Sequence, residues 1–292
     1  MPTFDTPDPI LVTLELEVAD VRITASDRKD TDVSVLPSNP AKPADVTAAE
    51  QTRVEYSAGR LLIKAPKGWR HFTPRSGIES IDVRIDLPAG SQIRGEAGVA
   101  ALHSTGPLGE CHFNTGVGDI QIEQTGPAHL TTGIGDISVD RASGSAQINT
   151  GSGTVRIGSV AGTAVVKGAN GDTWMGDVSQ DLRVVTANGS ISVDHAGASV
   201  VAKTANGDVR LGEVQGGTVV AQTALGKVEV GIRQGVAAWL DVNTRFGKVH
   251  NELDVAGPPQ TGESSVEVRA RSSFGDITIR RSAMTQTAVG AG

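Results

Sequence analysis

The residues of this sequence that could most directly bind a ligand are the aspartates of a recurring Gly-Asp motif. The segment Gly116–Asp119 is similar to the G-G-x-G-x-D turn that binds calcium in β-roll proteins. In that turn the aspartate comes two residues after the glycine, whereas Asp119 follows Gly118 directly. Lysine replaces the aspartate in two later copies, at Lys227 and Lys248. Because an ammonium group cannot coordinate a cation, we expect no calcium site and no bound metal.

Histidines and carboxylates offer a second kind of chemistry, catalysis on the outer face of a β-sheet. The histidines show no spacing of a known metal motif; they are His71, His103, His112, His129, His195 and His250. Carboxylate pairs could form between neighbouring strands, but the sequence does not show which carboxylates would be neighbours. The sequence therefore favours a protein without catalytic activity or cofactor. An enzyme that acts on a carbohydrate or small metabolite is the alternative.

One loop carries aromatic and basic residues that could recognise a partner. Residues 66–78 are rich in Pro and Gly, and two aromatic side chains lie there among basic ones. The residues concerned are Trp69, Arg70, His71, Phe72 and Arg75. Such clusters in loops are typical of binding sites. They could equally plug one end of the fold.

The elements that must position these residues come from an internal repeat. Segments such as TGIGDISV (132–139) and TANGDVRL (204–211) recur, with gaps of 17, 18, 18, 18, 18, 19, 21 and 28 residues between their glycines. Those glycines are Gly118, Gly135, Gly153, Gly171, Gly189, Gly207, Gly226, Gly247 and Gly275. Such a short period predicts stacked repeats, and we expect the glycines to form turns with a positive φ. The longest gap contains PPQTGE (258–263), which we interpret as an insertion.

Each repeat contains two short runs in which apolar and polar residues alternate, as in strands with one buried face. In the first run Ile137 and Val139 point inward, and by the same rule we expect three larger residues of other repeats to point outward: Arg156, Trp174 and Arg210. In the second run four outward positions are apolar: Val165, Val185, Val201 and Val220. Apolar residues on an outward face indicate a contact surface. The preference of β-branched residues for strands is the alternative explanation.

The pattern predicts an all-β fold, a flattened parallel β-solenoid with two strands in each turn of about 18 residues. Stacked antiparallel hairpins are the alternative, because Asn-Gly pairs such as Asn188-Gly189 favour hairpin turns. We favour the solenoid because the two corners of each repeat differ in kind while the period stays constant. Residues 1–95 are interpreted as irregular opening rungs and a cap, with a short helix at 44–52. They continue into regular repeats at 96–281 and a disordered tail at 282–292.

The Gly-Asp-Ile repeats, preceded by Leu87-Pro88-Ala89-Gly90, resemble the bacterial putative-adhesin family of β-strand-repeat proteins. That family is a domain of unknown function related to the toastrack domains. The resemblance covers about residues 10–280 and implies no catalytic residues. Related domains are linked to envelope-stress systems, often behind a membrane segment.

Composition narrows the remaining function classes. Acidic and basic residues are interspersed with a net charge of −7, which argues against a nucleic-acid-binding protein. The single cysteine, Cys111, allows no intrachain disulfide. No stretch approaches the roughly 18 apolar residues of a membrane span, and the N-terminus lacks the features of a signal peptide. If the sequence is full length, we therefore expect a cytoplasmic protein.

The expected function is that of a non-catalytic β-solenoid, a scaffold or protein-interaction module that could self-associate. Its partner would be a protein or a second copy, with a carbohydrate as a further candidate. A filament joined end to end through open rungs is another alternative.

Overall fold

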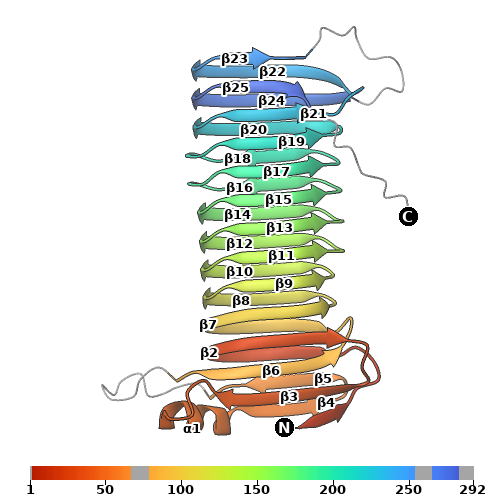
Figure 1. Ribbon diagram of the computed structural model, residues 1–292, viewed down its shortest axis with the longest axis vertical. Helices are drawn as coiled ribbons and strands as arrows, with labels where there is room; N and C mark the ends of the chain where they lie inside the picture. Colours follow the sequence, from red (N-terminus) through yellow and green to blue (C-terminus); the bar gives the residue numbers. More distant parts are fainter. Residues whose placement is uncertain (1, 67–78, 254–264, 283–292) are drawn as a thin grey trace, which may run out of the picture. The chain divides into compact units, whose positions relative to one another are not determined.

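The computed structural model describes residues 2–66, 79–253 and 265–282. The chain divides into two compact units, Met1–Thr173 and Trp174–Gly292. Each unit is built almost entirely of β-strands, most of them parallel (Figure 1). The loop residues Trp69, Arg70, His71, Phe72 and Arg75 lie outside the described residues, as do the insertion at 258–263 and the tail from 283 onward.

The regular part of unit 1 confirms the parallel β-solenoid. Its strands are β7 (Gln92–Pro107), β8 (Cys111–Val117), β9 (Ile120–Thr125), β10 (Ala128–Ile134), β11 (Ile137–Ala142), β12 (Ala146–Ser152), β13 (Val155–Val160) and β14 (Ala164–Asn170). Strands that follow a motif glycine (β9, β11, β13) pair in parallel in sheet 1, and strands that precede one (β8, β10, β12, β14) pair in parallel in sheet 2. Equivalent repeat positions face each other, so that Ile137 lies between Ile120 and Val155.

At the start of unit 1, antiparallel strands cover the first parallel strands. The strands of this region are β1 (Thr3–Asp5), β2 (Leu11–Ser26), β3 (Asp30–Pro37), β4 (Arg53–Ser57), β5 (Arg60–Lys64) and β6 (Ile81–Pro88). Strand β2 pairs with β5 and β6 on one side and with β7 on the other, so it lies between strands that come later in the chain. Strands β3 and β4 then cover β6 and β5 in antiparallel pairing, and β1 covers β3. The helix expected at 44–52 is α1 (Pro43–Gln51), which packs against β3 and β6.

Unit 2 continues the same pattern. It contains β15 (Thr173–Val178, which begins at the unit boundary), β16 (Leu182–Val185), β17 (Ile191–Ala196), β18 (Val200–Lys203), β19 (Val209–Val214), β20 (Gly217–Leu225), β21 (Val228–Ile232), β22 (Ala237–Phe246), β23 (Val249–Asn251), β24 (Ser265–Phe274) and β25 (Ile277–Arg281). Strands β16, β18 and β20 pair in parallel in sheet 2, and β17, β19 and β21 do so in sheet 1.

The last two rungs of unit 2 are stacked in the opposite order to their order along the chain. Strand β24 pairs with β20 on one side and with β22 on the other, and β25 lies in the same way between β21 and β23. The chain therefore forms the outermost rung, β22–β23, before it returns to fill the space behind it (Figure 1). Ion pairs join the inserted rung to both neighbours: Arg280 binds Glu229 of β21 at 2.7 Å, and Arg271 binds Asp241 of β22 at 2.6 Å.

The core lies between the two sheets, at the positions that the alternation predicts. In unit 1, Ile137 and Val139 of sheet 1 are each 1% exposed, and Ala146 and Ile148 of sheet 2 are also buried. The core is built mainly of aliphatic residues, with Phe113 as a buried aromatic residue. Among the described residues, no helix has the length and apolar character needed to cross a membrane.

Candidate binding surfaces and their corners

The corner at the motif glycines is built for stacking. Eight of the nine motif glycines have a positive φ, such as 142° at Gly207, and Gly247 is the exception. A Cβ atom at Gly207 would lie 2.2 Å from the carbonyl oxygen of Gly189, and one at Gly247 would lie 2.2 Å from that of Gly275. Backbone atoms therefore occupy the space of a side chain. This close contact with the backbone requires glycine even at Gly247, where φ is not positive.

The aspartates of the motif join successive rungs. The Oδ1 atom of Asp119 accepts a hydrogen bond from the backbone N–H of Asp136 at 2.8 Å, and Asp136 accepts one from Thr154 at 2.6 Å. In unit 2, Asp208 accepts one from the N–H of Lys227 at 2.7 Å. A lysine can therefore follow an aspartate in the column, because only its backbone is needed. Within residues 2–66, 79–253 and 265–282, no group of three His, Cys, Asp or Glu residues is placed to hold a metal ion.

The threonines beside these glycines are also structural. The hydroxyl of Thr204 donates to the carbonyl oxygen of Gly189 at 3.0 Å, and that of Thr223 donates to Gly207 at 2.8 Å. Both threonines are buried. These two threonines thus satisfy carbonyl groups of the previous rung.

The predicted outward residues of sheet 1 are distributed over both units. Arg156 is exposed and lies beside Ser138 in unit 1. In unit 2, Arg210 is exposed between Ser192 and Glu229, and Trp174 is half-buried. The register makes Arg210 part of a polar row.

Three of the outward valines form a small patch on sheet 2 of unit 2, which we call the valine patch: Val185, Val201 and Val220. Val201 and Val220 are direct neighbours on β18 and β20, and Val185 lies on β16 in the adjacent row, opposite Lys203. All three are half-buried. The fourth valine, Val165, belongs to unit 1 and lies beside Gln147.

Basic residues border the valine patch. Arg183 lies next to Val201 on one side, and Arg269 lies next to Val220 on the other. Lys203 occupies the following row of the same face. Arg269 is paired with Glu267 at 2.6 Å. The patch therefore combines an apolar centre with a mainly cationic border.

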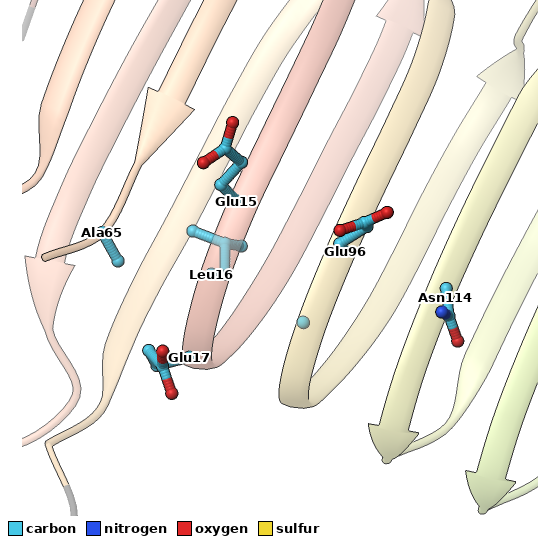
Figure 2. Close-up of a pocket in the computed structure, with 7 residues that line it drawn as sticks. Glu15, Leu16, Glu17, Ala65, Glu96 and Asn114 are labelled. Atoms are coloured by element: carbon cyan, nitrogen blue, oxygen red, sulfur yellow. The ribbon is translucent and has the colours of Figure 1, made fainter. Parts of the chain in front are cut away.

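A shallow cavity lies in unit 1. It has a volume of about 300 Å³, and its lining residues are Glu15, Leu16, Glu17, Ala65, Glu96, Ala97 and Asn114. Figure 2 shows Glu15 and Glu96 on neighbouring strands, where they are direct partners in register. The lining of this cavity contains no cysteine or serine nucleophile. A neighbouring cavity of about 440 Å³ shares Glu15 and Glu96 with it and is also lined by His112.

The cysteine offers no nucleophile either. Cys111 is fully buried, and this burial raises the pKa of its thiol to about 12. The reactive form of a cysteine is the thiolate, and at neutral pH such a thiol stays protonated.

Comparison with known proteins places the chain in a family. The family model Toastrack DUF4097 matches residues 12–280. The chain belongs to the Toastrack DUF4097 family. This confirms the resemblance that the repeats indicated. No curated protein matches the chain.

Solved structures similar to this Toastrack chain include proteins of three bacteria. A "putative cell adhesion protein" of Clostridium sporogenes is 12% identical with a TM-score of 0.26, covering 96% of this chain and 98% of that chain. A "putative adhesin" of Bacteroides fragilis is 14% identical with a TM-score of 0.35, covering 95% of both chains. A third, from Parabacteroides distasonis, is 13% identical with a TM-score of 0.32 and the same coverage. These likenesses do not indicate a function.

The Toastrack chain also exposes large apolar residues that sequence reasoning missed. In unit 2 they are Leu225, Trp239, Phe246, Val249 and Phe274, each between 46% and 59% exposed. The rings of Phe246 and Phe274 stack with centroids 4.8 Å apart. A signal was present, because Leu225, Phe246 and Phe274 directly precede a motif glycine, as Val117 and Ile134 do in unit 1, whereas the four other repeats carry Ser or Asn there. Trp239 is on the outward face of β22, and the exposure of Val249 follows from the exchanged order of the rungs, which the sequence does not show.

Proposed function

We propose that this Toastrack protein is a non-catalytic binding module and that the valine patch docks a protein partner. The observation that carries this proposal is the position of Val201 and Val220 side by side on an outward face, where the solenoid itself does not need apolar residues. Half-buried β-branched side chains on a flat sheet form a surface that can exclude water when covered.

The border of the patch indicates the chemistry of the partner. Arg183 and Lys203 lie next to Val201 and Val185 and would face any segment that covers them. A partner segment with apolar residues flanked by Asp or Glu would match both the centre and the border. Opposite charges around an apolar centre add specificity and speed association.

The test is a double substitution, Val201→Glu with Val220→Glu. An unpaired carboxylate buried in an interface costs several kcal/mol, whereas one in water costs little. We expect the double variant to lose capture of the partner and to keep the circular dichroism spectrum of the wild type. Val165→Glu is the matched control, because Val165 is an equally half-buried outward valine of sheet 2 outside the patch.

Charge reversal at the border separates binding from folding. Arg183→Glu with Lys203→Glu leaves the valines in place and should weaken capture at low salt more than at high salt. Equal capture by the wild type and both double variants would contradict the proposal.

A further inference from the structure

The outer edge of the rung β22–β23 has no partner in the part of the chain that the structure describes. Strand β22 pairs with β24 alone among the described strands, and β23 pairs with β25 alone. Each of the two strands therefore presents one row of backbone N–H and C=O groups to the outside. Such an edge is a template for pairing with another strand.

The apolar core is also open at this edge. Val249 is 46% exposed, although its in-register equivalents Ile277 and Val228 are 0% and 1% exposed. Leu240 and Val242 are only half-buried, whereas core positions of the neighbouring strand β24 are buried. The edge thus combines unpaired backbone with apolar side chains that one more rung would cover.

From this geometry we propose that the edge of β22–β23 is a self-association surface, and that its occupant is the same edge of a second copy. A twofold axis across the edge would place the two copies of the rung edge to edge, with their strands antiparallel. Antiparallel pairing satisfies the backbone groups of both edges, and the two open cores would meet. This surface is separate from the valine patch and does not depend on it.

The charges along β22 fit this symmetric arrangement. Asp241 and Arg245 are two residues before and two residues after Asn243 on the outward face of the strand. If the axis passes through Asn243, Asp241 of each copy lies opposite Arg245 of the other. Opposite charges directly across an antiparallel pair are stabilising, and like charges are destabilising.

A head-to-tail filament fits the described residues less well. In unit 1, the first rung strands β5 and β6 already pair with the antiparallel strands β4 and β3, and α1 packs against β3 and β6. These neighbours leave the edges of β5 and β6 unavailable for the edge of β22–β23. A closed dimer between two like edges is therefore favoured over an open chain of molecules.

The experiment measures the mass of the 292-residue protein in solution over a concentration series, by light scattering or sedimentation equilibrium. We expect the wild type to approach twice the 30.1 kDa of one chain as its concentration rises. Val249→Lys places a charge in the open core at the edge and should keep the protein monomeric. Ile134→Lys is the matched control, because Ile134 is 59% exposed and belongs to unit 1, whereas the edge belongs to unit 2. The control should dimerise like the wild type.

A second variant keeps the test decisive if Val249→Lys disturbs folding. Arg245→Asp changes an exposed side chain and would set like charges opposite each other in the dimer, so it should weaken dimerisation while circular dichroism stays unchanged. The proposal is overturned if the wild type stays monomeric at every concentration, as it would if another part of the chain or a different protein covers the edge. It is also overturned if mass grows beyond the dimer, or if Val249→Lys and Arg245→Asp both fold and dimerise like the control.

Discussion

At the scale of single residues, the motif glycine shows how stacking limits the choice of side chain. Gly207 combines a φ of 142° with a carbonyl oxygen 2.2 Å from the position of a Cβ atom. A positive φ alone disfavours other residues, and contact with backbone leaves no flexible side chain that could move away. The column therefore depends on glycine in every rung, whatever residue comes before it.

Gly207→Ala tests this dependence on glycine. We expect the variant to lose clearly more than the roughly 1 kcal/mol of unfolding free energy that an average substitution costs, because both φ and the close contact oppose the methyl group. The measurement is denaturant unfolding followed by circular dichroism. Gly216→Ala is the control, since the nearest atom to a Cβ there is 3.7 Å away and its φ is not positive. Similar stability of the two variants would show that the corner tolerates a side chain.

At the scale of secondary-structure elements, the exchanged order of the last rungs gives β24 and β25 an unusual role. They hold the outermost rung in place, because β22 and β23 have no other described strand to pair with. Backbone pairing on both sides is reinforced by the Arg280–Glu229 and Arg271–Asp241 ion pairs. In unit 1, β2 occupies a similar position between strands that follow it in the chain. Segments near both chain termini are thus paired on two sides, which opposes fraying.

Truncation after residue 253 should release the outermost rung. Without β24 and β25, the strands β22 and β23 lose their described pairings, and the backbone around Arg245 and Lys248 becomes accessible. We expect trypsin to cleave the truncated protein rapidly at these two residues, as identified by mass spectrometry. Truncation after residue 282 is the control, because it keeps both strands and should be cleaved there as slowly as the full chain. Equal cleavage in the two truncated proteins would show that β24 and β25 do not protect this rung.

At the scale of the whole molecule, the motif aspartates join successive rungs through hydrogen bonds to the backbone. Asp119, Asp136 and Asp208 each accept a hydrogen bond from a backbone N–H of the neighbouring rung. A calcium β-roll would direct the same oxygens at an ion instead.

Calcium should therefore leave the thermal stability of the protein unchanged. A ligand that binds only the folded state raises the melting temperature, so a melting curve with calcium and one with a chelator should coincide. A reproducible rise with calcium would show that the motif aspartates bind a cation as well as the backbone of the next rung.

Much of this architecture could be read from the sequence because each rung repeats the same local chemistry. The alternation of Ile137, Ser138 and Val139 determined which side chains are buried, since a strand has a period of two. The spacing of the glycines determined the parallel register, because stacking needs the same residue type at the same height in every rung. The outward valines could be identified by the same rule.

Only the tertiary structure decided which rungs are neighbours at the end of unit 2. Repeats that follow one pattern can pair with one another in more than one order, and local propensity does not distinguish these orders. The structure places Gly275 between Gly226 and Gly247, and this order leaves Val249 exposed on an open edge. The sequence determined the structure of each rung, because the alternation of side chains and the choice of turn residues act locally. The stacking order, and with it the proposed self-association surface, depended on contacts between residues far apart in the chain.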